Sequence, residues 1–277
     1  MGDLLQQMFL PQGILFAPLI IGLFGSLSFG VIGSYVVVRR ISYAAYGISH
    51  TVLLGVGAAL FLNHYAEWGW LSPLYGAFLV ALLSAWLIGV STLRAPHRSD
   101  SVISAITVVG MSGGLLLLSV TPGYFEPMSY LFGDILLVSL ADAVRVGVLN
   151  LVIVLGGILG YRRLQMVCFD EEFARLKGIH TGFWFVFLLT LTAATVVLMM
   201  NLVGLVLAIA LLTLPVMTAL RFAHRLLHVM GLSALLCAFC VTFGLALSYH
   251  FDLPSGAVIV LLAGAVYLLS LCFGRRL

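Results

Sequence analysis

The sequence contains very little charge. Of its 277 residues, only 8% are Asp, Glu, Lys or Arg, while 62% are hydrophobic. Soluble domains carry about 25% charged residues, because these side chains cover a surface that faces water. So little charge excludes a water-exposed domain and predicts an integral membrane protein. Apolar runs long enough to cross a bilayer recur along the chain, which favours helices over the short alternating strands of a barrel.

Several motifs that would signal other functions are also missing. The sequence has no Gly-x-x-x-x-Gly-Lys-Ser/Thr phosphate loop, which excludes an ATPase, and no His-Glu-x-x-His cluster, which argues against an intramembrane metalloenzyme. The central parts of the apolar runs hold no Asp or Glu. A proton-coupled secondary metal transporter needs such residues within the membrane and stays only an alternative. The basic residues are spread through short loops, which does not indicate nucleic-acid binding.

The apolar pattern predicts an all-α, polytopic bundle of about nine transmembrane helices, forming one transmembrane domain over residues 1–277. The sixth and seventh spans meet at Asn201 with almost no loop, so eight crossings remain the alternative. The expected spans are 14–38, 43–63, 70–93, 101–121, 139–160, 183–201, 203–221, 230–249 and 255–273.

Basic residues identify one side of the membrane. Lys and Arg follow the first, third, fifth, seventh and ninth spans, whereas the loops between these positions contain none. Cytoplasmic loops of membrane proteins are enriched in Lys and Arg. With nine spans, this asymmetry predicts a cytoplasmic C-terminus and an external N-terminus. With eight spans, the N-terminus would move to the cytoplasm.

The longest polar stretch, at about 162–181, predicts a short amphipathic helix on the cytoplasmic side. Phe169, Phe173 and Leu176 have the spacing of one helix face. Three acidic residues lie in the first turn, and Gly178 fits the position where a helix stops. The helix could lie on the lipid surface, but anionic lipid would repel its acidic start. Docking of a soluble partner is therefore favoured.

His50 is the most informative single residue, because it lies within the apolar run 43–61. An imidazole inside a bilayer needs a hydrogen-bond partner or a ligand, so it predicts a functional site. The alternative is a core histidine that is satisfied by a hydrogen bond.

Four blocks of sequence occur in an order that points to a known family. They read Arg-Arg-x-Ser-Tyr at 39–43, leading to His50 and to Leu-Gly at 54–55; Ser-Tyr-Leu-Phe-Gly-Asp-Ile-Leu at 129–136; Phe-Asp-Glu-Glu-Phe-Ala at 169–174; and 204–215, followed by Asp-Leu-Pro-Ser-Gly at 252–256. With these blocks the sequence resembles the permease subunits of bacterial ABC importers for zinc, manganese and iron. The resemblance covers about residues 20–272.

The resemblance implies an ATP-driven importer in which two permease copies form the metal pathway in the bacterial cytoplasmic (inner) membrane. Two cytoplasmic ATPase subunits and an external metal-binding protein complete it. The permease itself has no enzyme activity and holds no permanent cofactor; zinc, manganese or iron is its cargo. The resemblance also assigns contact with the ATPase to one set of residues. These are Phe169, Asp170, Glu171, Glu172, Phe173, Arg175 and Gly178.

The metal-binding helix departs from the family pattern Gly-Asp-x-x-x-His. Segment 45–50 reads Ala-Tyr-Gly-Ile-Ser-His, so His50 matches the histidine and Tyr46 replaces the aspartate. Tyr, with a pKa of about 10, is a poor ligand for a divalent ion. Three explanations stay open: hydroxyls such as those of Ser49 or Thr51 rebuild the site, the cargo is a partly liganded metal, or His50 binds metal weakly and transiently. We favour the last, because a transporter must also release its cargo.

The identity of the metal is less constrained by the sequence. A site led by an imidazole, without a carboxylate, suits zinc somewhat better than manganese. His64, beside Glu67, and His250, two residues before Asp252, are candidates for an outer metal site or for contact with the metal-binding protein. The alternative for both is a solvated loop residue.

Overall fold

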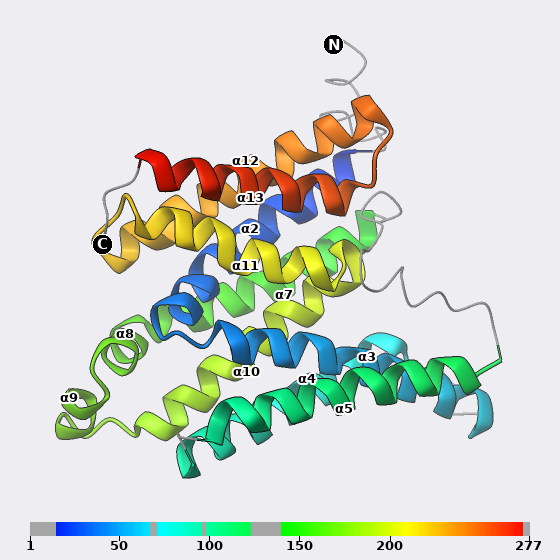
Figure 1. Ribbon diagram of the computed structural model, residues 1–277, viewed down its shortest axis with the longest axis horizontal. Helices are drawn as coiled ribbons and strands as arrows, with labels where there is room; N and C mark the ends of the chain where they lie inside the picture. Colours follow the sequence, from blue (N-terminus) through cyan, green and yellow to red (C-terminus); the bar gives the residue numbers. More distant parts are fainter. Residues whose placement is uncertain (1–14, 67–70, 96–97, 123–139, 274–277) are drawn as a thin grey trace.

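The computed structural model describes residues 15–66, 71–95, 98–122 and 140–273, and these ranges form α-helices joined by short connections (Figure 1). The prediction of an all-α bundle is therefore confirmed. The helices are α2 (Phe16–Val38), α3 (Ser42–Tyr65), α4 (Pro73–Arg94), α5 (Ser99–Val120), α7 (Leu140–Leu159), α8 (Tyr161–Phe169), α9 (Glu171–Leu176), α10 (Thr181–Val203), α11 (Leu205–Leu220), α12 (Leu226–Phe251) and α13 (Ser255–Phe273).

Each of the nine predicted spans corresponds to one helix. Seven of the described helices are long and apolar enough to cross a membrane alone, and an eighth span results if α7 and α8, which meet at a 65° bend, are counted together. α11 has only 16 residues, or about 24 Å, which is shorter than a hydrocarbon core of about 30 Å. α10 and α11 run in opposite directions on either side of Gly204 (Figure 1), whose φ of 83° suits glycine. They are therefore two separate helices that reverse direction at Gly204, not one broken span.

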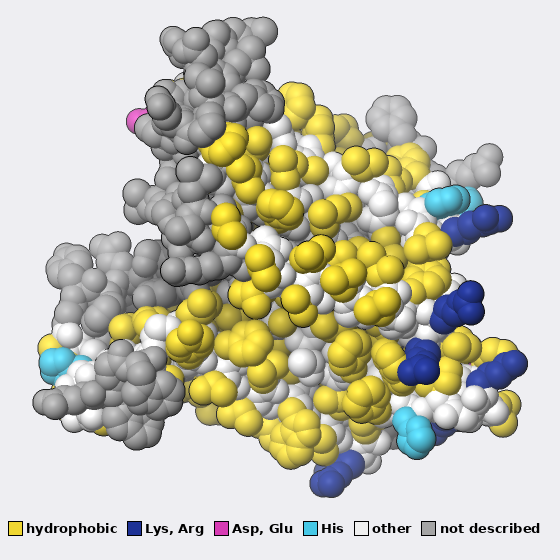
Figure 2. Space-filling model, turned by 180° about the vertical axis from the view of Figure 1, so that it is seen from behind, with side chains coloured by type: hydrophobic (Ala, Val, Ile, Leu, Met, Phe, Trp, Pro, Cys, Tyr) yellow, Lys and Arg dark blue, Asp and Glu magenta, His cyan; other side chains and the backbone are white. Residues whose placement is uncertain are grey.

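The described Lys and Arg side chains gather at one end of the bundle, which we call the basic end. It lies on the left in Figure 1 and on the right in Figure 2, where the blue side chains border a broad hydrophobic surface. The connections between α2 and α3, α4 and α5, α7 and α10, and α11 and α12 meet there. Basic residues that alternate along the sequence are thus brought together in space.

α2 lies at the centre of the bundle, and small residues let its neighbours approach closely. A Cβ on Gly30 would lie 2.8 Å from the backbone nitrogen of Ala234 on α12, so a larger residue would force the two helices apart. Ser34 lies beside Ser233 of α12, with their hydroxyl oxygens 3.4 Å apart. The buried Tyr35 donates its hydroxyl to the carbonyl of Gly157, 2.9 Å away on α7. The glycine-serine stripe therefore packs helices, as small residues commonly do in membranes.

The polar segment differs from its predicted form. Phe169 does not belong to the short helix but ends α8, and the prediction of one helix that includes both Phe169 and Phe173 is wrong. The cause lies at Asp170, whose extended backbone (φ −148°, ψ 96°) separates α8 from α9. There its side chain can accept a hydrogen bond from the first turn of α9, which favours a new helix start over continuation of α8.

Candidate functional site

α3 carries an aromatic stripe that leads to His50. The helix places Tyr43, Tyr46 and His50 at spacings of three and four residues, hence on one face. The rings of Tyr46 and His50 have centroids 4.3 Å apart, and Tyr43 stacks on Tyr46 at 6.4 Å. Both tyrosines are exposed, and His50 is partly buried. This face of α3 is therefore open in the single chain.

His50 has an unsatisfied ring nitrogen. Its Nδ1 is buried and has no hydrogen-bond partner among the described residues. Buried polar atoms in folded proteins are nearly always satisfied by protein, water or a ligand. The observation argues against a core histidine that is satisfied within the chain, and it supports the prediction of a functional site.

The hydroxyls next to His50 are not brought to the aromatic stripe. Ser49 is buried and donates its hydroxyl to the carbonyl of Ala45 at 2.7 Å. Thr51 is also buried, with its hydroxyl oxygen 2.7 Å from the carbonyl of Ile48 and 2.9 Å from the hydroxyl of Ser84. Both hydroxyls are thus engaged in contacts within and between helices, whereas Tyr46 faces outward.

The two outer histidines lie apart from His50. His64 and His250 are exposed in the last turns of α3 and α12, at the end of the bundle opposite the basic end. Each ring contacts that of the next residue, Tyr65 or Phe251, with centroids 4.9 Å apart. Within the described ranges, no group of three His, Cys, Asp or Glu side chains could hold a metal ion. Among these residues His50 is therefore an isolated imidazole with Tyr46 as its ring neighbour.

At the basic end, local sequence signals define α9. Asp170 caps its start, because the carboxylate accepts the backbone N–H of Phe173 at 2.9 Å. Gly178, with φ of 77°, ends it. The N–H groups of Gly178 and Ile179 donate to the carbonyls of Arg175 and Ala174, the bonding pattern of a glycine-terminated helix. The predicted stop at Gly178 is confirmed.

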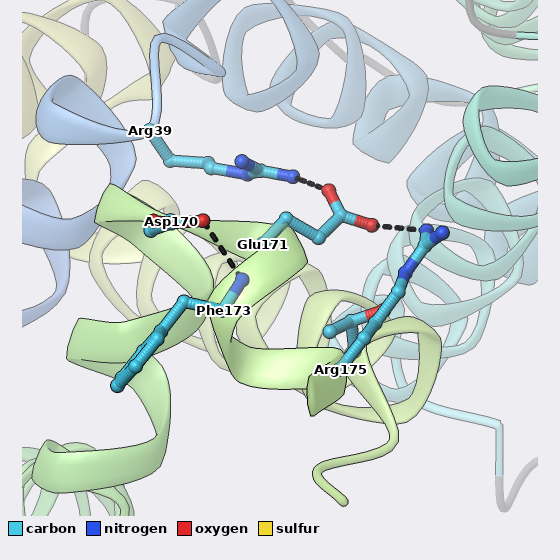
Figure 3. Close-up of polar contacts among 6 residues, drawn as sticks. Arg39, Asp170, Glu171, Phe173 and Arg175 are labelled. Atoms are coloured by element: carbon cyan, nitrogen blue, oxygen red, sulfur yellow. Dashed lines mark hydrogen bonds and ion pairs between the residues drawn. The ribbon is translucent and has the colours of Figure 1, made fainter. Parts of the chain in front are cut away.

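Glu171 pairs with one arginine from another part of the chain and with one arginine of α9 itself (Figure 3). One carboxylate oxygen pairs with Arg39, at the end of α2, and the other pairs with Arg175 at 2.6 Å. Arg175 also donates from Nε to the hydroxyl of Thr181, at the start of α10, at 3.2 Å. Burial by itself raises the pKa of Glu171, but the hydrogen bonds and charges of the two arginines outweigh it and lower this pKa. Glu171 is therefore held as a carboxylate.

Three exposed apolar side chains lie at the basic end: Phe169, which ends α8, and Phe173 and Leu176 on α9; together we call them the docking patch. Leu176 is 87% exposed, and both phenylalanines are exposed as well. The ammonium group of Lys177 lies 5.5 Å from the ring centroid of Phe173, so charged and apolar groups share this surface. Hydrophobic side chains grouped beside charges are typical of protein interaction sites.

Sequence reasoning missed the connection between the two candidate regions. Arg39 was visible as part of a motif, and Glu171 as part of the polar segment, but they are 132 positions apart. No spacing rule relates them, because the pairing depends on how α2, α9 and α10 pack. The contact between the tilted rings of Tyr46 and His50 could have been expected, since residues four apart on a helix are neighbours.

Comparison with known proteins decides the family. Residues 12–274 match the ABC 3 transport family. This chain belongs to that family. It is 38% identical over 263 residues to a probable metal transport system membrane protein of Chlamydia trachomatis, covering 95% of this chain and 89% of the relative. It is 28% identical to the high-affinity zinc uptake system membrane protein ZnuB of Haemophilus influenzae, with 95% and 99% covered.

A solved structure supports the same conclusion. PsaBC from Streptococcus pneumoniae, in complex with Fab, superimposes with a TM-score of 0.80 at 27% identity, covering 97% of this chain and 94% of that one. The resemblance to ABC importer permeases is therefore confirmed. As a member of the family, the chain is a membrane permease subunit of an ABC transporter, and ATP hydrolysis belongs to a separate subunit.

Proposed function

We propose that this permease carries a divalent transition-metal ion inward, with zinc as the first candidate, manganese next and iron third. Relatives named as metal and zinc transport proteins support a metal cargo. Zinc comes first because an imidazole without a neighbouring carboxylate suits it better than it suits manganese. The ion is a transported substrate that the permease binds only in passing.

The observation that carries this proposal is the open aromatic stripe with His50 and its unsatisfied Nδ1. A metal pathway must be shielded from lipid, yet Tyr43 and Tyr46 are exposed in the single chain. A second copy of the permease that covers this face of α3 would enclose the pathway. His50 would then bind the ion weakly, with Tyr46 beside it and no carboxylate within the described part of α3.

The docking patch is the proposed contact for a cytoplasmic ATPase subunit, one for each permease copy. Phe169, Phe173 and Leu176 are exposed, and α9 carries charged side chains as well. The concentration of Arg and Lys at this end supports a cytoplasmic position for it in the bacterial inner membrane, with the C-terminus on that side. The opposite end, where His64 and His250 lie, would then receive metal from an external binding protein.

Transport measurements test the pathway. The permease, reconstituted in proteoliposomes with its ATPase and metal-binding protein, is compared with His50→Ala and Tyr46→Asp for uptake of zinc and of manganese. We expect His50→Ala to abolish uptake, because the only imidazole on the stripe is lost. Tyr46→Asp should change the preference between the two metals, because it adds a charged oxygen ligand one helical turn from His50.

His228→Ala serves as the matched control, since His228 is an exposed imidazole at the basic end and outside the stripe. Its uptake should equal that of the native complex. Native rates in both His50→Ala and Tyr46→Asp would show that the pathway lies elsewhere. Stimulation of ATP hydrolysis by manganese and not by zinc would reverse the order of the metals.

Co-purification tests the docking patch. Phe173→Ser and Leu176→Ser each remove an apolar side chain that a partner would bury, worth about 1.5–3 kcal/mol. ATPase binding should therefore weaken by about 10- to 150-fold in each variant. Phe222→Ser is the control, because Phe222 is also exposed at the basic end but lies outside the patch. Equal ATPase recovery from all four proteins would exclude the patch as the docking site.

A further inference from the structure

Glu171 does not face outward like the docking patch but points to the start of the helix that carries His50. Its carboxylate pairs with Arg39, at the turn between α2 and α3 (Figure 3). The two side chains are only 25% and 26% exposed. A partner subunit would therefore have little access to this ion pair, and its role must be sought within the permease.

The turn that holds Arg39 is tightly built. Arg39 donates its backbone N–H to the carbonyl of Tyr35, and Arg40 adopts a left-handed conformation with φ of 60°. The N–H groups of Arg40 and Ile41 bond back to the carbonyls of Val37 and Val36. α3 begins immediately afterwards at Ser42, about 12 Å along the helix from His50. A displacement of this turn would therefore move the start of α3.

α9 needs contacts with the rest of the chain to keep its position. It has six residues, and isolated helices shorter than about 12–15 residues are marginal in water. The carboxylate of Glu171 pairs with Arg39 and, within α9, with Arg175. Arg175 in turn donates a hydrogen bond to the hydroxyl of Thr181, at the start of α10. These contacts attach α9 both to the turn before α3 and to α10.

The space around the ion pair leaves room for movement. A cavity of about 160 Å³ is lined by Arg39, Thr92, Leu93, Glu171, Arg175 and Phe185. The guanidinium of Arg39 lies 5.8 Å from the ring centroid of Phe185. Residues from α4, α9, α10 and the end of α2 thus line one cavity, which the Arg39–Glu171 ion pair borders.

We propose that the Arg39–Glu171 ion pair transmits movement of α9 to the His50 helix, so that ATPase-driven displacement at the docking patch opens or closes the metal pathway. This proposal rests on the proposed docking of the ATPase at α9. It assigns to Arg39 and Glu171 the role of positioning residues, which act through the turn at 39–41 rather than by touching the ATPase or the metal.

The test measures metal uptake and ATP hydrolysis together in proteoliposomes holding the complete complex. Arg39→Gln, Glu171→Gln and the double variant are compared with the native chain. We expect each single variant to keep its ATPase subunit and to hydrolyse ATP, while metal transported per ATP falls by about 5-fold or more. The double variant should show no larger defect, because both changes break the same link.

Two further variants keep the outcome informative. Arg39→Lys retains the charge and should restore most of the coupling, which a purely structural role of the arginine would not explain. Asp100→Asn, an exposed carboxylate at the same end, is the matched control and should behave as native. If Glu171→Gln does not assemble, the comparison of Arg39→Gln with Arg39→Lys carries the test.

The results also separate this proposal from the one on which it rests. Native coupling in Arg39→Gln and Glu171→Gln, in a complex that transports metal, would overturn the transmission role alone. Strictly additive defects in the double variant would overturn it as well. Loss of the ATPase subunit from both variants would show that the pair acts on docking, not on transmission. A native complex without metal uptake would instead refute the proposed function.

Discussion

Replacing Gly178 by alanine should loosen α9 through the backbone alone. Gly178 has φ of 77°, and a Cβ added there would meet no atom within 4 Å. The new methyl group would therefore clash with nothing. The substitution would cost free energy only because alanine must adopt the left-handed backbone conformation. That penalty is about 1–2 kcal/mol for an L-residue. It would raise the population of molecules in which the end of α9 is open by about 5- to 30-fold.

Amide hydrogen exchange, measured on the permease in lipid nanodiscs, reports this opening directly. The N–H of Ile179 is bonded to the carbonyl of Ala174 at 3.0 Å, so it exchanges only when the end of α9 opens. We expect its exchange to be about 5- to 30-fold faster in Gly178→Ala. Gly178→Asn should lie closer to the native rate, because Asn tolerates the left-handed region better.

Gly231→Ala is the matched control for this prediction. Gly231 also has no atom within 4 Å of a Cβ, but it lies inside α12 without a positive φ. Alanine is favoured over glycine in a helix by about 0.8–1.0 kcal/mol, so this variant should be no less protected than native. Unchanged exchange at Ile179 in Gly178→Ala would refute the argument that backbone strain at this glycine determines where α9 ends.

Two further predictions concern the same helix. Asp170→Ala removes the cap that accepts the N–H of Phe173 and should destabilise α9 by about 1 kcal/mol; unchanged exchange of the Phe173 amide would contradict it, and Asp100→Asn is the control. The pKa of Glu171 is lowered in the folded chain. Its contribution to the stability of α9 is therefore complete above the ordinary carboxyl range, and it is lost progressively as pH falls from that range through the lowered value. Protection of α9, corrected for intrinsic exchange, should thus be constant from about pH 7 to 5, whereas loss of protection within that interval would contradict the ion-pair account.

Much of the fold was predictable because a lipid environment leaves the backbone few options. Each apolar segment must satisfy its own N–H and C=O groups, so it forms a helix, and hydropathy located all nine. The capping signals of α9 are equally local: Gly178 was correctly predicted as the stop. The break at Asp170 was not, because an acidic residue suits both a helix cap and a first helical turn.

The candidate site, too, was predictable only where it depends on residues that are close in the sequence. Residues four apart on a helix must be neighbours, so Tyr46 and His50 were linked by sequence alone. Whether their face of α3 is covered depends on how α3 packs against α4 and α5, and no local signal specifies that. Only the structure shows that Tyr46 is exposed while Ser49, three residues along the same helix, is buried.

The sequence by itself determined the helices, the alternation of basic loops and the position of a lone intramembrane histidine. Each follows from interactions between residues near in the chain, or between one segment and its solvent. The tertiary structure alone decided that Arg39 meets Glu171, because an ion pair between residues 132 positions apart exists only when separate helices pack in one arrangement. That contact joins the two ends of the proposed mechanism, the docking patch and the helix that carries His50.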